Sequence, residues 1–265
     1  MDSDDPVLQR LLTQFDGVPG AVVALSGGAD SSLVLAAAVR ALGADRVVAA
    51  TATSPTYLDD ELAAAREVAA GLGVEHVVLE TREFDDPRFV ENSRERCYWC
   101  KAGLLDALVE VAAERGARVV DGANADDVGD HRPGMKAAAE RGVLQPLLSA
   151  GVSKPEVRRL ARELGLPTWD RPQQACLASR IRYGEPITAD KLAAVATVEK
   201  ALHELGFRQC RARHHGDVAR LEIEAAELGR AFALRDEIAR RVHEAGFTYA
   251  TLDLDGFRTG SMNEA

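Results

Sequence analysis

The stretch Ser26-Gly27-Gly28-Ala29-Asp30-Ser31-Ser32 decides the predicted fold. An apolar run, residues 21–25, precedes it and is typical of a buried parallel strand. A run rich in Ala and Leu, residues 33–39, follows it and predicts a helix. A glycine turn between a strand and a helix directs backbone N–H groups and the positive end of the helix dipole at one point. The stretch therefore predicts a phosphate-binding loop.

The side chains of this loop support that interpretation. Gly27 and Gly28 allow the main chain to approach an anion closely and to take positive φ angles. The three serines add hydroxyl donors, and Asp30 can hold a magnesium ion that bridges phosphates. No lysine stands in the stretch, so it is not a Walker A loop. The alternative is an ordinary glycine turn with Asp30 or Ser31 as helix N-cap, which does not require serines on both sides of two glycines.

The pattern S-G-G-x-D-S after a strand resembles the PP-loop of the ATP pyrophosphatase superfamily. This resemblance implies that ATP is split between its α and β phosphates and that a substrate is adenylated. ATP and Mg²⁺ are the expected ligands of Ser26, Gly27, Gly28, Asp30, Ser31 and Ser32.

Composition limits the classes of protein to consider. The 265 residues carry a formal net charge of -10, which argues against a broad nucleic-acid-binding surface. No apolar run approaches the length of a membrane span, and the acidic residues 2–5 are unlike a signal peptide. We therefore expect a cytoplasmic protein without a membrane or nucleic-acid partner. In that compartment, four cysteines indicate thiols, metal ligands or catalysis rather than structural disulfides.

Alternating strands and helices predict an α/β fold, a doubly wound parallel sheet of the PP-loop ATP pyrophosphatase type, over residues 1–170. The predicted strands are residues 21–25, 46–51, 75–79, 117–122 and 143–148, the last being a fifth strand or the edge of one. The predicted helices are residues 6–16, 33–43, 58–70 and 102–115, and a helix that a capping box at Ser153 and Glu156 opens.

Residues 168–181 form a predicted loop and contain the expected domain boundary. Residues 171–265 predict a smaller C-terminal α+β domain for substrate binding and oligomerisation. Its predicted elements are helix 188–205, strands 209–213 and 218–223 around a turn at 214–217, helix 226–245 and strand 249–254. The similar segments 201–207 and 241–247 predict a recurring helix end.

An acidic loop, residues 123–134, follows the fourth predicted strand and contains Asp126, Asp127 and Asp130. Ligands of doubly wound sheets bind at the carboxyl ends of the strands, so this loop is expected to face the same crevice as the PP-loop. Its carboxylates can hold magnesium or position a substrate, and Asp127 is the candidate magnesium ligand. The alternative is a solvated loop in which Asn and Asp make turns.

Three further segments narrow the resemblance: residues 94–101 (R-E-R-C-Y-W-C-K), residues 176–180 (C-L-A-S-R) and residues 211–215 (R-A-R-H-H). With them, the chain resembles the LarE family of ATP-dependent sulfur transferases over nearly its whole length. The resemblance implies sulfur insertion into a pyridinium dicarboxylate mononucleotide, during synthesis of the nickel-pincer nucleotide of lactate racemase. A substrate carboxylate attacks the α-phosphate of ATP, and a sulfur nucleophile then displaces AMP. The resemblance also implies a homo-oligomer, a trimer or a hexamer.

The family uses two sulfur sources. In one branch the cysteine at the Cys176 position gives up its own sulfur and becomes dehydroalanine. In the other, three cysteines hold a 4Fe-4S cluster whose fourth iron binds an additional sulfide. The spacing of Cys97 and Cys100 suits two ligands of one cluster, with Cys176 as the third, so we expect the cluster branch. The alternatives are that Cys176 acts alone, or that Cys210 or a histidine completes a zinc site; Cys210 begins a predicted strand, which favours a small buried core residue.

The resemblance assigns substrate contacts to Ser179, Arg180, Arg211 and Arg213. Arg211 and Arg213 alternate along a predicted strand and so share a face, which suits a phosphate or carboxylate clamp. A solvated basic edge is the alternative. Acidic positions of the family match Glu199 and Glu222, and Lys101 is either a phosphate neighbour or solvated.

Three other functions compete with this hypothesis. In tRNA thiolation some PP-loop enzymes also use three cysteines and a cluster, but the net charge and the lack of a recognisable RNA-binding appendage oppose it. An ammonia-dependent PP-loop ligase gives Cys176 no role. A non-catalytic ATP-binding module would bind ATP without releasing pyrophosphate.

Overall fold

The computed structural model describes residues 5–56, 59–127, 133–172 and 175–258. Contacts divide the chain into two units. Unit 1 contains residues 1–54, 59–86 and 95–173, and unit 2 contains residues 55–58, 87–94 and 174–265. Unit 2 therefore includes two short segments from the first part of the sequence. Within the described residues, every helix is too short or too polar to cross a membrane.

Unit 1 contains a parallel sheet, as predicted. Its strands β1 (Ala21–Ala24), β2 (Val47–Thr53), β3 (Glu75–Glu80) and β4 (Arg118–Val120) run in the spatial order β3-β2-β1-β4. The order reverses at β1, because β2 and β3 lie on one side of it and β4 on the other. Such a reversal is the topological switch point at which doubly wound sheets bind ligands.

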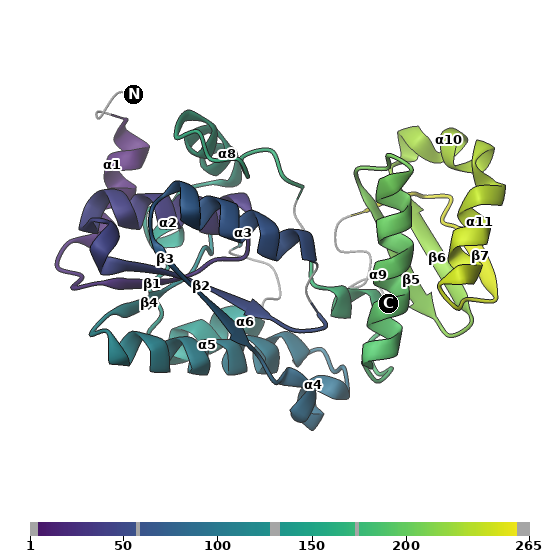
Figure 1. Cartoon of the computed structure of the whole chain (residues 1–265), viewed down its shortest axis with the longest axis horizontal. Coiled ribbons are helices and arrows are strands. Elements are labelled where there is room, and N and C mark those ends of the chain that lie inside the picture. Colours follow the sequence, from purple (N-terminus) through teal and green to yellow (C-terminus); the bar gives the residue numbers. More distant parts are fainter. Residues whose placement is uncertain (1–4, 57–58, 128–132, 173–174, 259–265) are drawn as a thin grey trace. The chain divides into compact units, whose positions relative to one another are not determined.

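Helices cover both faces of this sheet (Figure 1). The alternation of buried side chains along β1 explains the two layers, because Ala21 and Val23 belong to one core cluster and Val22 belongs to the other. The first cluster includes residues of α1 (Pro6–Leu12), α2 (Ala29–Leu42), α3 (Asp59–Gly71) and α8 (Lys154–Glu163). The second includes residues of α5 (Arg96–Glu114) and α6 (Pro133–Glu140). The predicted fold class is confirmed.

Two predicted elements of unit 1 are wrong in detail. Residues 143–148 form no strand: Leu144 makes a single parallel bridge to Val120, and α7 (Pro146–Ser149) follows. Pro146 has no N–H to continue a ladder, and it occupies a position that proline favours at the start of a helix. The helix predicted from residue 102 begins at Arg96 instead, so Cys97 and Cys100 lie in its first turns. The capping box of Ser153 and Glu156 is present as predicted.

Unit 2 is a mixed α+β structure. Its sheet has the order β5-β6-β7, made of β5 (Cys210–His215), β6 (Val218–Ile223) and β7 (Tyr249–Leu252). The pair β5–β6 is antiparallel and the pair β6–β7 is parallel. The helices are α4 (Pro87–Val90), α9 (Ala189–Glu204), α10 (Leu228–Ala233) and α11 (Arg235–Glu244).

Sequence patterns misplaced two features of unit 2. The predicted turn at residues 214–217 is shorter, because His214 and His215 belong to β5 and pair with Ala219 and Val218. Gly216 supplies the positive φ angle of 63° that a two-residue hairpin loop requires. The helix predicted over residues 226–245 is interrupted at Leu234, which has φ -95° and ψ 12°. Neither glycine nor proline stands at this interruption, so no local pattern indicates it.

The recurring helix end is confirmed. After α9, the N–H of Phe207 donates to the carbonyl of Leu202 (3.1 Å), and His203 Nδ1 contacts the carbonyl of Phe207 at 2.8 Å. After α11, His243 Nδ1 contacts the carbonyl of Phe247 at 3.0 Å in the same way. Each helix thus ends in a glycine turn that a histidine side chain closes, before a strand begins.

Three histidines are held in places that disfavour their charged form. Burial, and then nearby Arg66, lower the pKa of His76, whose Nε2 lies 2.8 Å from Thr51 Oγ1. Because that hydroxyl donates to the carbonyl of Leu25 (2.7 Å), it accepts from Nε2–H of a neutral ring. Burial also lowers the pKa of His214 and His215, with smaller contributions from Lys191 and Arg220 respectively.

These lowered pKa values predict a loss of stability in mild acid. Below the ordinary histidine pKa of 6.5, the unfolded chain binds protons that the folded chain does not, so stability present above pH 6.5 is lost as the pH falls below it. We expect the midpoint temperature of thermal unfolding to be lower at about pH 5.5 than at pH 8. The difference between the two pH values should be smaller in His76→Asn. Equal midpoints at both pH values would contradict the prediction.

Candidate active site

The predicted PP-loop lies at the switch point of the unit 1 sheet. It leaves the end of β1 and enters α2, whose N-cap is Gly28. Ser31 Oγ lies 3.2 Å from the backbone N of Ser26 and 3.1 Å from its Oγ. Ser32 is buried, and its hydroxyl donates to the carbonyl of Gly28 at 2.8 Å. The serines therefore brace the loop, while Ser26 itself is exposed.

Two glycines allow the backbone to pass close to its neighbours here. Gly27 has φ +75°, and a Cβ at this position would collide with the carbonyl oxygen of Glu61 in α3. Gly122 follows β4, and a Cβ there would lie 2.9 Å from the backbone N of Ser31. The first turn of α2 is thus enclosed by backbone on two sides, which places its N–H groups rigidly.

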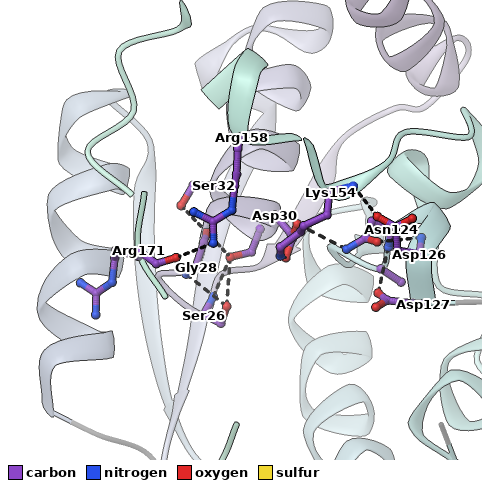
Figure 2. Close-up of polar contacts among 12 residues, drawn as sticks. Ser26, Gly28, Asp30, Ser32, Asn124, Asp126, Asp127, Lys154, Arg158 and Arg171 are labelled. Atoms are coloured by element: carbon purple, nitrogen blue, oxygen red, sulfur yellow. Dashed lines mark hydrogen bonds and ion pairs between the residues drawn. The ribbon is translucent and has the colours of Figure 1, made fainter. Parts of the chain in front are cut away.

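A lysine that no sequence motif indicates lies beside the loop. Lys154, the first residue of α8, forms an ion pair with Asp30 through its Nζ. Its backbone N donates to Asp126 Oδ2 at 2.6 Å, so Lys154 lies between the PP-loop and the acidic loop (Figure 2). Both Asp30 and Lys154 keep about a quarter of their side-chain surface exposed (24% and 25%). The cation that the S-G-G-x-D-S pattern lacks is therefore supplied from a distant part of the sequence.

The acidic loop faces the PP-loop, as expected from its place after β4. Asn124 Nδ2 donates to Asp30 Oδ1 at 3.4 Å, and its backbone N donates to Asp127 Oδ2 at 3.0 Å (Figure 2). The backbone N of Asp126 donates to Asn124 Oδ1. Asn124 therefore both forms a turn within the acidic loop and contacts Asp30 of the PP-loop. Asp130 lies outside the described residues.

The cysteine pair lies on the first turns of α5. Residues three apart on a helix are neighbours, so Cys97 and Cys100 share a face. Cys97 is exposed and Cys100 is partly buried. Nearby Lys101 forms an ion pair of 3.2 Å with Asp121, the residue after β4. This contact neutralises Lys101 at the switch-point edge instead of leaving it solvated.

Cys176 lies in unit 2, in the turn before the short 3-10 helix Leu177–Arg180. It is partly buried, and no disulfide joins any of the four cysteines, all of which the structure describes. The turn is held by Arg180, whose buried guanidinium donates to the carbonyls of Ala175 (2.6 Å) and Cys176 (3.2 Å). Its other two nitrogens donate to the two carboxylate oxygens of Glu199, each at 2.7 Å.

Arg211 and Arg213 lie two residues apart on β5 and are both buried. Arg213 donates to Glu222 (2.8 Å) and to the carbonyl of Ser179 (2.8 Å). Arg211 donates to the carbonyl of Cys210 (2.7 Å), and its guanidinium lies 5.2 Å from the ring centroid of Phe257. Burial, and then the charge of Arg180, lower the pKa of Arg211 to about 10. Concentrated positive charge of this kind favours an anionic ligand.

The structure contradicts the zinc alternative at Cys210. Its side chain is fully buried, and burial followed by the charge of Glu199 raises the pKa of the thiol to about 12. A zinc ligand must be a thiolate, which this site disfavours. Within the described ranges, no group of three or more histidine, cysteine or acidic side chains is arranged to hold a metal ion. Cys97 and Cys100 belong to unit 1, whereas Cys176 belongs to unit 2.

Comparison with known proteins agrees with this geometry. A parallel α/β sheet with the loop S-G-G-x-D-S at its switch point is typical of PP-loop nucleotide enzymes. The family model described as asparagine synthase matches residues 14–220 of the chain. The chain is 39% identical over 243 residues to pyridinium-3,5-bisthiocarboxylic acid mononucleotide synthase of Lactiplantibacillus plantarum, covering 91% of this chain and 88% of that protein. The chain therefore belongs to the LarE family of ATP-dependent sulfur transferases within this PP-loop class.

Two other relatives have no stated activity. An uncharacterized protein of Synechocystis sp. is 40% identical over 259 residues, which cover 97% of this chain and 96% of that protein. An uncharacterized protein of Methanocaldococcus jannaschii is 27% identical over 173 residues, covering 65% and 68% respectively.

The close approach at Gly27 predicts an unusually costly substitution. Gly27→Ala adds a Cβ that meets the backbone of α3, and it also places Ala at a positive φ angle. Gly73→Ala is the matched control, because Gly73 has φ +67° but nothing within 4 Å of its Cβ position. In urea titrations we expect Gly27→Ala to lose about 1–3 kcal/mol more unfolding free energy than Gly73→Ala. Equal losses would show that the contact with α3 imposes no constraint.

Proposed function

We propose that this chain adenylates a carboxylate of a pyridinium dicarboxylate mononucleotide with ATP and replaces it with a thiocarboxylate. A carboxylate oxygen attacks the α-phosphorus, and the bond to the bridging oxygen breaks as pyrophosphate leaves. A sulfur nucleophile then attacks the acyl carbon, and AMP leaves with the carboxylate oxygen. The observation that carries this proposal is the connection of the Cys176 turn to β5, through Arg213 and the carbonyl of Ser179, which joins a sulfur to an anion-attracting strand.

The ATP half of the reaction belongs to the loop at the switch point. Its backbone N–H groups and serines bind phosphate oxygens, and Asp30 binds Mg²⁺, with Asp127 as the second candidate. The contact between Lys154 and Asp30 supports this assignment, because a cation already occupies the place beside that carboxylate. When Mg²⁺ and ATP arrive, Lys154 exchanges Asp30 for a phosphate oxygen.

The substrate half belongs to unit 2. Arg211 and Arg213 bind the phosphate of the mononucleotide, and the hydroxyl of Ser179 is a further contact. Arg220 shares Glu222 with Arg213, donating to Oε1 at 2.9 Å. Arg220 also forms an ion pair with Asp253 at 3.2 Å, so it holds Glu222 in place for Arg213.

The sulfur source is proposed to be a 4Fe-4S cluster with Cys97, Cys100 and Cys176 as ligands. The spacing of Cys97 and Cys100 on α5 would suit two ligands of a cluster, and Cys176 would be the third. Such a cluster, with three protein ligands, would supply an exchangeable sulfide. The alternative is that Cys176 gives up its own sulfur and becomes dehydroalanine. Both sources place Cys176 at the reaction centre.

The wider role follows from the relative's product and is equally part of the proposal. The thiocarboxylate is a precursor of a nickel-pincer nucleotide, and the chain acts as a homo-oligomer, a trimer or a hexamer, in the cytoplasm. Its partners are ATP, the mononucleotide and a sulfide donor.

Adenylation predicts AMP and pyrophosphate as products of ATP, Mg²⁺ and the mononucleotide. Lys154→Gln removes a charge-assisted hydrogen bond and should raise the Kd for ATP about ten- to a hundredfold. The control is Arg40→Gln, which removes an exposed cation at the other end of α2. Calorimetry measures the Kd, and chromatography identifies the products. ADP and phosphate as products would rule out adenylation.

The two sulfur sources predict different cysteine phenotypes. If a cluster forms, Cys97→Ala, Cys100→Ala and Cys176→Ala all fail, and the wild-type protein turns over repeatedly with added sulfide under anaerobic conditions. Iron and sulfide analysis, product per protein and intact mass check this outcome. If Cys97→Ala keeps full activity and the wild-type protein stops after one turnover with a loss of about 34 Da, the mass of hydrogen sulfide, then Cys176 is the donor. Full activity of Cys176→Ala would refute both.

A further inference from the structure

All three guanidinium nitrogens of Arg180 donate hydrogen bonds within the chain. Its side chain is fully buried (0% exposed), and Nε and Nη2 both donate to Glu199. Its Nη1 donates to the carbonyls of Ala175 and Cys176 and to Ser179 Oγ at 2.9 Å. These bonds use four of the five N–H groups of the guanidinium, because Nη2 donates to one acceptor and the three acceptors of Nη1 share two hydrogens. A substrate contact would have to reach a side chain that is fully buried.

The carboxylate of Glu199 connects two parts of the substrate half-site. Glu199 lies on α9, is 1% exposed, and accepts the backbone N–H of Ala212 at 2.9 Å in addition to Arg180. Ala212 stands between Arg211 and Arg213 on β5. A single carboxylate thus ties the turn of Cys176 to the strand that presents the two arginines.

Other contacts hold the same turn but do not replace this connection. The backbone N of Leu177 donates to the carbonyl of Thr56 (3.0 Å), and Ser179 N donates to the carbonyl of Cys176 (2.9 Å). Ile181 forms a parallel bridge with His214 of β5. The guanidinium of Arg180 adds the contact that fixes the carbonyl of Cys176 from the inside of the unit.

A buried ion pair is a poor source of stability, because the cost of removing two charges from water offsets their attraction. A pair of apolar residues of similar size often stabilises a fold as well or better. The placement of reacting groups has a much larger effect on rate, since a displacement of about 1 Å at a reacting centre can cost about a hundredfold. The contacts of Arg180 and Glu199 all lead to the Cys176 turn and β5.

We propose that the Arg180–Glu199 pair is a positioning device that fixes Cys176 relative to the Arg211–Arg213 strand and does not itself contact the substrate. This inference deepens the proposed function and rests on it in one respect, namely that sulfur transfer takes place at Cys176. It replaces the role of substrate contact that the family resemblance gives to Arg180.

The test separates sulfur transfer from the steps before it. The variants are Glu199→Gln, which keeps the shape of the carboxylate, and the double variant Arg180→Gln/Glu199→Gln, which leaves neither charge unpaired. The control is Arg240→Gln/Glu237→Gln, which removes an exposed ion pair of α11 in the same unit. Thermal unfolding verifies the fold, and Glu199→Gln serves alone if the double variant does not fold.

We expect the ratio of thiocarboxylate formed to pyrophosphate released to fall about tenfold or more in both variants and to be unchanged in the control. The Kd of the mononucleotide should stay within about twofold, because a group that does not contact the substrate contributes no binding energy. Amide hydrogen exchange of residues 175–181 should become faster. Arg211→Gln, in contrast, should weaken mononucleotide binding.

Two results would overturn the proposal. A large rise in the Kd of the mononucleotide in the double variant, but not in Glu199→Gln, would show that Arg180 contacts the substrate. An unchanged ratio of product to pyrophosphate would show that the pair only supports the fold. Failure of the proposed function is distinguishable, because it would appear in the wild-type protein as an absence of AMP and pyrophosphate, while the exchange measurement needs no turnover.

Discussion

The geometry of unit 1 depends on backbone approaching backbone at the first turn of α2. Gly27 lies against α3 and Gly122 lies against Ser31, and in neither place is there room for a side chain. The loop is therefore enclosed between a helix and the end of the neighbouring strand β4. The same enclosure brings Asn124 to Asp30, and α8 closes the site with Lys154. An anion site assembled in this way needs little reorganisation when its ligand arrives, which lowers the free-energy cost of binding.

In unit 2, buried charges add to the order that an apolar core and a close backbone approach at Gly256 provide. Arg180, Arg213 and Arg220 each bind a buried carboxylate, and these carboxylates also accept backbone groups or a second arginine. Buried charges must be paired, so each partner restricts where the others can lie. The result is a strand, β5, whose arginines are buried and held by several contacts, with the Cys176 turn attached to it through Arg213.

Much of unit 1 could be predicted from the sequence, because its signals are local. Apolar runs mark the buried strands, and Ser153 with Glu156 marks a helix start that the structure contains. The contact of Lys154 with Asp30 could not be predicted, because it joins residues far apart in the chain and no pattern links them. The prediction of a strand at residues 143–148 was wrong, because an apolar run that contains proline is compatible both with a strand and with the start of a helix. In unit 2 the arginines could be named, but which acid each one binds depends on the fold.

Unit 2 cannot be separated from the rest of the chain at a single point. Residues 87–94 belong to unit 2 although unit 1 precedes and follows them. Within this segment Asn92 is fully buried at φ 57°, and its side-chain amide donates to the carbonyls of Arg182 (2.7 Å) and Glu185 (2.9 Å). A fragment that began at residue 174 would lack this amide and expose those carbonyls. The C-terminal part is therefore not an interchangeable module, and genetic recombination that exchanged it at one junction would have to supply a matching segment in the N-terminal part.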